Sequence, residues 1–414
     1  MPCPPESGAT PALPPDRTIQ QAIQRAIDPA GERSVAGDRS IVVNLAFVSP
    51  KPTGLATYAI NLIPHLPLSE MTVLASNQLT WIPAGLKTYP VPANLTYEQG
   101  KWGHLRRLLW TQWRLPQICA ELQADLLFAP VPELPIDWTG NGQSPPAVVM
   151  VHDVIPLRFP SRTSPLTYYF RYYVPSVLRQ ARHILCNSIA TAQDIQQFYG
   201  IAAAQITPIA LGYDANHFRP VPTSASDRPY GSERPYFIYV GRHDPYKNLQ
   251  RLIAAFAALP ESVDCELWIG GSTDPRFTPL LQTQVNELAV GDRVKFLDYV
   301  AYADLPELLR GALAMVYPSL WEGFGFPVLE AMACGAPVIT SHLSSLPEVV
   351  GDAAILIDPY NLADLTAAMQ QIATDAITRT QLQQAGLARS KQFSWQKTGQ
   401  ATAALLQQFR SQEI

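Results

Sequence analysis

Short, almost wholly apolar strands alternate with helical stretches along most of this chain, and no other feature restricts its fold as strongly. In the first half the strand-like stretches are IVVNLAF (41–47), MTVLAS (71–76), DLLFAP (125–130), AVVMVHD (147–153) and HILCNS (183–188). Near-continuous apolar strands are typical of strands buried on both faces, and the helices between them provide the crossovers that parallel strands require. The pattern therefore predicts an α/β fold with a doubly wound parallel sheet.

The alternation breaks at residues 212–235, where several prolines give the chain the composition of a linker, and then starts again. The second group of strand-like stretches is YFIYVG (236–241), CELWIGG (265–271), VKFLDY (294–299), GALAMVYPS (311–319), APVITS (336–341) and AAILID (353–358). A chain of 414 residues exceeds one ordinary hydrophobic core. We therefore expect two such sheets facing each other across a cleft, with ligands at the carboxyl ends of the strands.

Bulk composition narrows the class of protein. Charged residues make up 15% of the chain, and the net charge of −4 comes without the basic block that would indicate nucleic acid. No apolar run reaches the roughly 18 residues of a membrane span, and residues 1–37 are Pro-rich, unlike a secretory signal. We expect a cytoplasmic protein in which residues 1–37 form a mostly flexible extension, with a short helix at 18–27. Its cysteines, never paired as C-x-x-C, are expected to be buried or incidental thiols: Cys3, Cys119, Cys186, Cys265 and Cys334.

Two glutamates, Glu322 and Glu330, bracket the sequence GFGFPVL. Proline is favoured in the first turn of a helix, so we expect a helix from near Pro327 to Cys334, closed by Gly335. A glycine-rich loop before a helix N-terminus suits a phosphate, and carboxylates suit hydroxyl groups. The combination favours a nucleotide sugar as ligand. Solvated surface glutamates and a glycosidase-like acid/base pair are the alternatives.

Two cations follow the first strand of the second half, in the sequence GRHDPYKNL. Gly241 permits a tight exit from the strand, and Arg242 and Lys247 flank the start of the next helix. A guanidinium fork and an ammonium point charge both suit a diphosphate. Cations at a helix start oppose its dipole, so their presence favours an anionic ligand over the alternative of two ordinary surface groups.

In the first half, His152 and Asp153 end an apolar strand. A histidine at the carboxyl end of a strand can orient or activate a reacting group, whereas a purely structural histidine is the alternative. Gly54, in the turn TGLATY, can face a phosphate or an acceptor, but the sequence is not a dinucleotide-binding fingerprint. Gly270 ends another strand and permits close approach of a nucleotide base. Ser188 is expected to cap a helix.

Metal-binding patterns are missing from the sequence. No two aspartates lie two apart, so the Asp-x-Asp pattern of a metal–diphosphate site is not present, and no His/Cys cluster indicates zinc. We therefore expect no cofactor, with cationic side chains and helix ends doing the work of a metal ion.

Several of these stretches together resemble the retaining glycosyltransferases of family 4, which have the GT-B fold. They are GRHDPYKNL, VKFLDYV, PSLWEGFGFPVLEAMACGAPVITS and SSLPEVVGDAAILIDP, and the resemblance is specific over 236–395 and weaker over 41–212. It implies an N-terminal Rossmann-like acceptor domain, a C-terminal Rossmann-like nucleotide-sugar domain, and a last helix that crosses back to the first domain. With the extension, the expected divisions are 1–37, 38–212, 213–395 and 396–414.

The resemblance also implies roles for residues at matching positions. Arg242 and Lys247 would clamp the donor diphosphate, Glu322 would contact the donor sugar, and Glu330 would hold the ribose hydroxyls. Further donor contacts would come from backbone groups of Gly241, Gly270, Gly323, Phe324 and Gly325.

On the acceptor side, His152 resembles the active-site histidine of the family, with Asp153 beside it and Gly54 in the first loop. That loop often reads Gly-x-Gly, and Ala56 here replaces its second glycine. The expected catalytic set is therefore His152, Arg242, Lys247 and Glu322.

The expected reaction is metal-independent transfer of a sugar from GDP-mannose or a UDP-sugar to a hydroxyl of a glycan or lipid-linked acceptor, with retention of configuration. The stretch VHDVIPLRFP resembles mannosyltransferase-like members and favours mannose. The alternatives are a nucleotide-sugar epimerase or hydrolase on the same fold, and a non-catalytic nucleotide-sugar-binding scaffold.

The stretch RRLLWTQWRLP (106–116) also resembles mannosyltransferase-like members and admits two interpretations. It can rest weakly on an anionic membrane surface at the inner face of the membrane, or it can be an amphipathic surface helix packed by its tryptophans. The residues concerned are Arg106, Arg107, Trp110, Trp113 and Arg114.

Overall fold

The computed structural model describes residues 40–50, 54–140, 144–221 and 234–411. The helix expected at 18–27, Cys3 and residues 222–233 of the linker lie outside these ranges. The four cysteines within them are buried and unpaired, as expected. Among the described helices, none combines the length and apolar character that crossing a membrane requires.

The N-terminal part of the chain forms a seven-stranded parallel sheet in the order β3-β2-β1-β4-β5-β6-β7. Its strands are β1 Ser40–Asn44, β2 Met71–Ala75, β3 Lys87–Pro90, β4 Ala124–Ala129, β5 Ala147–Val151, β6 His183–Cys186 and β7 Ile206–Pro208. The helices between them are α2 Gly54–Leu62, α3 Gly100–Glu121, α4 Ile155–Arg158, α5 Pro165–Tyr168, the π-helix η5 Tyr169–Tyr173, α6 Val174–Gln180 and α7 Ile189–Tyr199.

The C-terminal part forms a six-stranded parallel sheet in the order β10-β9-β8-β11-β12-β13. Its strands are β8 Tyr236–Val240, β9 Glu266–Gly270, β10 Val294–Phe296, β11 Ala314–Tyr317, β12 Val338–Ser341 and β13 Ile355–Ile357. The helices are α8 Leu249–Ala257, α9 Thr278–Glu287, α10 Leu305–Gly311, α11 Phe326–Cys334, α12 Leu346–Val350, α13 Leu362–Thr374, α14 Ala376–Ser390 and α15 Trp395–Ser411. Two parallel sheets of this kind confirm the predicted fold class.

Alternating side chains of the strands build two apolar layers on the first sheet. In β1, Ile41 and Val43 belong to one core cluster and Val42 to the other, as the period of two in a strand requires. One layer packs against α3, α6 and α7, and the other packs against α2 and α15. Helices thus cover both faces of the sheet, which is why its strands read as continuous apolar runs.

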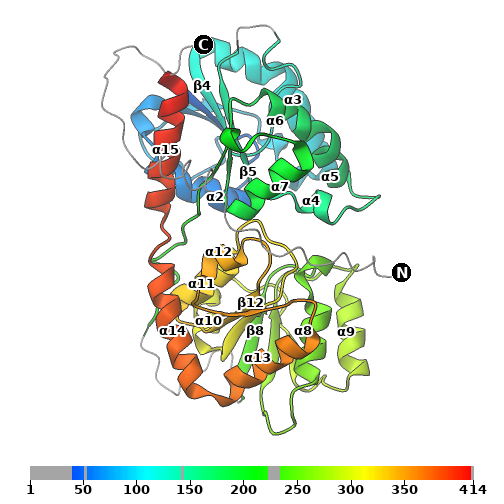
Figure 1. The fold of residues 1–414 in the computed structure, drawn as a ribbon. Coiled ribbons are helices and arrows are strands. Elements are labelled where there is room, and N and C mark those ends of the chain that lie inside the picture. Colours follow the sequence, from blue (N-terminus) through cyan, green and yellow to red (C-terminus); the bar gives the residue numbers. More distant parts are fainter. Residues whose placement is uncertain (1–39, 51–53, 141–143, 222–233, 412–414) are drawn as a thin grey trace.

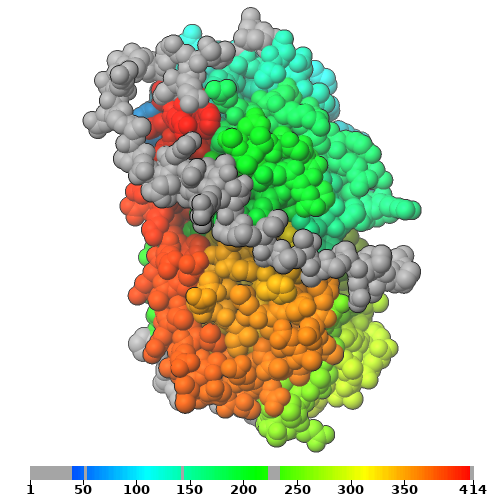
Figure 2. All heavy atoms as spheres, viewed as in Figure 1, coloured from blue at the N-terminus to red at the C-terminus, as the bar shows by residue number. Residues whose placement is uncertain are grey.

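The last helix leaves the C-terminal lobe and packs on the N-terminal one. Figure 1 shows α15 beside the upper lobe, and in Figure 2 the red C-terminal segment runs along one side of both lobes. Leu405 and Leu406 of α15 are buried there, and α15 contacts α2 and β4. Gly212 packs closely against the backbone of Trp395. A Cβ atom at position 212 would be 2.1 Å from the Trp395 backbone nitrogen, so only glycine fits there.

Some element boundaries differ from expectation. The strand expected at 41–47 ends at Asn44. Helix α2 ends at Leu62, and the chain continues as a 3₁₀ turn. Strands β3 and β7 at the two edges of the first sheet were not expected. β3 is largely exposed and β7 has three residues, so neither carries a long apolar run.

Candidate functional site

Lys247 and Glu322 form a buried ion pair at the carboxyl ends of β8 and β11. The Lys247 Nζ atom lies 2.6 Å from Glu322 Oε1 and 3.0 Å from the Tyr317 hydroxyl. Burial by itself would lower the pKa of Lys247, but the Glu322 carboxylate outweighs it and holds this pKa above its ordinary value. The sequence predicted both as site residues, and the structure brings them into direct contact.

Hydrogen bonds with Ser344 and Ser345 fix the loop that carries Glu322. The Ser345 hydroxyl donates to the Glu322 carbonyl at 3.1 Å and to the Phe324 carbonyl at 2.8 Å. The Glu322 N–H donates to the Ser344 hydroxyl at 3.0 Å. Within the described part of the chain, no hydrogen bond engages the N–H groups of Gly323, Phe324 and Gly325. These N–H groups therefore have no protein acceptor among the described residues.

Helix α11 begins and ends as expected. Gly325 precedes it with φ of 108°, Pro327 lies in its first turn, and Gly335 closes it with φ of 83°. Glu330 lies on this helix, and no hydrogen bond or ion pair engages its carboxyl within the described residues. Burial, and then the charge of Asp214, raise the pKa of Glu330 to about 8.

Gly323 brings the two lobes into contact at the carboxyl end of β5. A Cβ atom at Gly323 would lie 2.2 Å from the His152 carbonyl oxygen and 3.0 Å from the Asp153 Cβ. The Gly323 carbonyl accepts hydrogen bonds from the Ser188 hydroxyl at 2.6 Å and from the Thr191 hydroxyl at 3.2 Å. The predicted donor loop and the predicted acceptor-side histidine therefore meet across the junction of the lobes.

The His152 ring is held on two sides. Its Nε2 atom lies 2.9 Å from the Pro130 carbonyl oxygen, and its ring meets the Tyr58 ring edge-on with centroids 4.8 Å apart. Burial lowers the pKa of His152 to about 4, so the ring is neutral at pH 7. Burial raises the pKa of neighbouring Asp153 to about 6, and its Oδ1 atom accepts from the Ile155 N–H at 3.0 Å.

Arg242 does not join Lys247. Its side chain is 72% exposed, and its Nε atom lies 2.9 Å from Asp244. Gly241 and Gly270 contact each other through a backbone hydrogen bond of 2.9 Å, and a Cβ atom at Gly241 would lie 2.6 Å from the Tyr239 hydroxyl. Close packing therefore accounts for Gly241, and the donor contacts assigned to these residues stay predictions.

Gly54 is the first residue of α2, and a Cβ atom there would meet nothing within 4 Å. Its proposed role on the acceptor side stays a prediction. Ala56, which replaces the second glycine of the family's loop, lies within α2 and is buried in the core, so its methyl group serves packing. Ser188 caps α7 as expected, because its hydroxyl accepts from the Thr191 N–H at 3.0 Å.

Sequence reasoning missed the side chains that join the lobes. The Glu348 carboxylate accepts the N–H groups of Ile189 and Ala190 at the start of α7, each at 2.7 Å. The Trp321 indole donates to Asp194 at 2.9 Å, and the Arg158 guanidinium lies 3.4 Å from the Trp321 ring centre. These partners are more than 100 positions apart, so no local pattern connects them. The only local sequence signal for these contacts was the position of Glu348 in the first turn of α12.

Metal ligands do not gather at this site. In the described ranges, no group of three or more His, Cys, Asp or Glu side chains has an arrangement that could hold a metal ion.

Family comparisons divide the chain in the same two parts. Residues 52–217 match the family model described as Glycosyltransferase Family 4, and residues 224–389 match the one described as Glycosyl transferases group 1.

Two relatives are named as O-antigen chain mannosyltransferases. The chain is 26% identical to O-antigen chain mannosyltransferase RfbU of Salmonella typhimurium, over 82% of this chain and 93% of that protein. It is 38% identical to O-antigen chain mannosyltransferase B of Escherichia coli, but this match spans only 39% of this chain and 42% of that protein.

Solved structures share the architecture. Sucrose-phosphate synthase from Thermosynechococcus elongatus superposes with a TM-score of 0.71 at 20% identity, covering 89% of this chain and 98% of that one. Anabaena HepE in complex with UDP and glucose superposes with a TM-score of 0.69 at 22% identity, covering 89% and 100%. At this level of identity the likeness concerns the fold alone.

Proposed function

The chain belongs to the group 1 and family 4 glycosyltransferases, and from this premise we propose that it transfers mannose from GDP-mannose to a hydroxyl of a glycan or lipid-linked acceptor. The observation that carries the proposal is the contact between the Glu322 loop, with its buried Lys247 partner, and His152 across the two lobes. Mannose is favoured because two relatives named as mannosyltransferases match this chain.

Donor binding in this proposal uses the Lys247–Glu322 pair, the N–H groups before α11 and Glu330. The diphosphate lies against the Lys247 ammonium and the unpaired N–H groups before α11, because both favour negative charge. Glu322 faces the sugar hydroxyls. Glu330 accepts hydrogen bonds from the ribose hydroxyls, since its carboxyl has no hydrogen-bond partner among the described residues.

The proposed reaction proceeds on one face of the sugar. The bond between C1 and the phosphate oxygen breaks, and its electron pair stays on the departing diphosphate. The acceptor oxygen then bonds to C1 from that same face, and its proton passes to the phosphate oxygen, so configuration is retained. Lys247 and the N-terminus of α11 stabilise the charge that develops on the leaving group.

A donor panel tests this function. Purified protein is incubated with GDP-mannose, UDP-glucose or ADP-glucose and a lipid-linked acceptor, and the product linkage is assigned by NMR. We expect mannosyl transfer with an α-anomer from the α-linked donor, and the same rate after EDTA treatment. Sugar release at equal rate without acceptor would favour the hydrolase alternative. Loss of activity in EDTA with rescue by Mg²⁺ would contradict metal independence.

We further propose that α3 rests on an anionic lipid surface during transfer. Trp113 is 66% and Trp102 69% exposed, and with Leu109 and the exposed Arg106 they lie on one face of this helix. Trp110 packs inward and so fits the alternative of a tryptophan-packed surface helix. The two interpretations thus apply to different residues of the same helix.

Vesicle co-sedimentation tests the lipid contact. We expect binding to vesicles containing phosphatidylglycerol, little binding to pure phosphatidylcholine, and loss of binding in the Trp102→Ala/Trp113→Ala variant. Leu280→Ala removes an exposed apolar side chain of α9 and serves as the matched control. Absence of wild-type binding to anionic vesicles would refute the proposal.

A further inference from the structure

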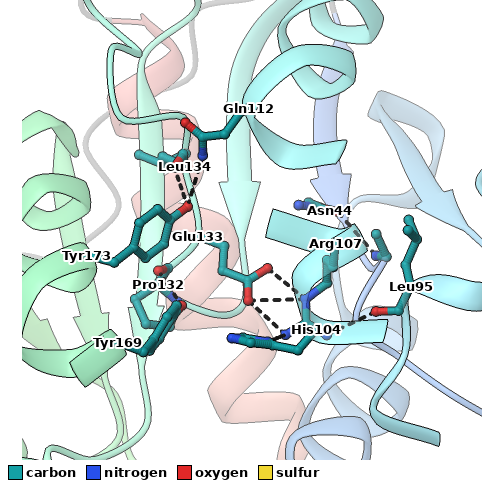
Figure 3. Close-up of polar contacts among 11 residues, drawn as sticks. Asn44, Leu95, His104, Arg107, Gln112, Pro132, Glu133, Leu134, Tyr169 and Tyr173 are labelled. Atoms are coloured by element: carbon teal, nitrogen blue, oxygen red, sulfur yellow. Dashed lines mark hydrogen bonds and ion pairs between the residues drawn. The ribbon is translucent and has the colours of Figure 1, made fainter. Parts of the chain in front are cut away.

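The segment 130–136, which follows β4, is held almost entirely by side chains from other elements. Three of its residues are prolines and lack an N–H donor, so the segment cannot join a strand ladder. The Tyr169 hydroxyl donates to the Pro132 carbonyl at 2.9 Å, and the Tyr173 hydroxyl donates to the Leu134 carbonyl at 2.5 Å (Figure 3). The geometry of this segment therefore depends on those partners.

Glu133 lies at the middle of the segment and forms a buried pair with Arg107 of α3. Its two carboxylate oxygens accept from the Arg107 guanidinium, with Nε–Oε2 and Nη2–Oε1 distances of 2.9 Å (Figure 3). Arg107 also donates to the Leu95 carbonyl at 3.1 Å and lies 2.9 Å from His104 Nδ1. The side chains of Arg107 and Glu133 are 12% and 3% exposed.

A buried pair of this kind is a poor source of stability. Removing two charges from water costs several kcal/mol per ion, roughly what their attraction returns. In other proteins, replacing a buried ion pair with apolar residues of similar volume is often neutral for stability. The pair does, however, fix the direction of a planar, bidentate contact, and so it fixes the path of the segment that carries Glu133.

The same segment begins with the carbonyl group that contacts His152. The Pro130 oxygen lies 2.9 Å from His152 Nε2, and a carbonyl oxygen can only accept a hydrogen bond. Nε2 must therefore carry the proton, and the lone pair of Nδ1 is left as an acceptor. Within the described residues no hydrogen bond engages Nδ1.

We propose that Arg107 and Glu133 are positioning residues for His152: they hold segment 130–136 so that the Pro130 carbonyl fixes the ring with its proton on Nε2. Nδ1 then accepts a hydrogen bond from a substrate hydroxyl. This inference rests on the proposed transferase function, because it assigns the hydroxyl to the bound sugar or acceptor. Arg107 and Glu133 themselves touch no substrate and act through the carbonyl.

Nitrogen NMR of histidine-labelled protein tests the inference without any substrate. His152 is assigned by comparison with His152→Gln, and long-range ¹H–¹⁵N spectra distinguish the two tautomers of a neutral ring. We expect a single Nε2–H form in the wild-type protein and a mixture of both forms in Glu133→Gln. In the transfer assay, kcat of this variant should fall about tenfold, the effect of one lost hydrogen bond, with the donor KM unchanged.

Two further variants keep the outcome decisive. Glu121→Gln breaks the exposed ion pair with Arg114 on the same helix and should change neither the spectrum nor kcat. If Glu133→Gln does not fold, Tyr169→Phe removes only the hydroxyl that binds the Pro132 carbonyl, and it should shift the tautomer ratio in the same direction.

A wild-type tautomer and a wild-type kcat in both Glu133→Gln and Tyr169→Phe would overturn the inference. The spectrum is independent of turnover. A tautomer change in a protein that transfers no sugar would therefore refute the proposed function and leave the positioning role standing.

Discussion

At the scale of single residues, the site contains carboxyl groups whose protonation depends on burial. Glu330 is the clearest case, because burial and then Asp214 raise its pKa to about 8, whereas an exposed glutamate titrates near 4.5. At pH 7 the carboxyl is therefore mainly protonated before the donor binds. A carboxylate accepts two hydroxyl hydrogen bonds better than the neutral acid does, so donor binding should favour ionisation.

Donor binding should accordingly release a proton near Glu330. As pH rises through about 8, the ionised form is already present and donor affinity should increase, whereas below it affinity should fall. Calorimetry of GDP binding at pH 7 in two buffers with different ionisation enthalpies measures this release directly. In Glu330→Gln the heats in the two buffers should agree. Equal heats for the wild-type protein would contradict the assigned role.

A second prediction concerns the backbone at Gly323. In Gly323→Ala the new methyl group would lie 2.2 Å from the His152 carbonyl oxygen, so the loop must move away from β5. Because one misplaced loop at the reacting centre commonly costs about a hundredfold in rate, kcat should fall by that order. Gly291→Ala is the control, since its methyl group meets no atom closer than 3.7 Å. Circular dichroism should show both variants folded, and full activity of Gly323→Ala would count against the contact.

At the scale of elements, the apolar strands and α11 were predictable because their signals are local. β5 and β8 are continuous apolar runs, and Pro327 and Gly335 mark the two ends of a single helix. β3 was missed because an exposed edge strand carries no such run.

Site residues divide in the same way. Lys247, Glu322 and Glu330 lie in short motifs, so the sequence could single them out as candidate site residues. The exposure of Arg242 was not predictable, because its neighbour Asp244 competes for the guanidinium. The contact of the Pro130 carbonyl with His152 was not predictable either, because a backbone group carries no residue-type signal. The contact of Glu348 with Ala190, 158 positions away, was not predictable because no local pattern connects the two residues.

At the scale of the whole molecule, several contacts join the lobes beside the site, and two of them use a carboxylate. One joins the α12 carboxylate of Glu348 to the start of α7, and the other joins Trp321 to Asp194. Helix N-termini expose N–H groups that need acceptors, so the Glu348 contact supplies what α7 lacks. The lobes should therefore separate more readily when this carboxylate is removed.

Small-angle scattering of Glu348→Ala tests that expectation. We expect a larger radius of gyration than in the wild-type protein and a several-fold higher acceptor KM, since the proposed acceptor position lies between the lobes. Glu287→Ala removes an exposed glutamate at the end of α9 and should change neither quantity. An unchanged radius and KM in Glu348→Ala would show that the contact does not set the spacing of the lobes.

The central claim is that the buried Lys247–Glu322 pair lines a nucleotide-sugar binding site. Titration calorimetry of GDP-mannose and UDP-glucose against the wild-type protein, Lys247→Gln and the control Lys391→Gln, an exposed lysine after α14, tests it most directly. We expect the wild-type and Lys391→Gln proteins to bind GDP-mannose alike, and Lys247→Gln to bind it at least about tenfold more weakly, because a charge-assisted contact to the diphosphate is lost. Equal affinity in all three proteins, or no binding of either donor by the wild type, would contradict the claim.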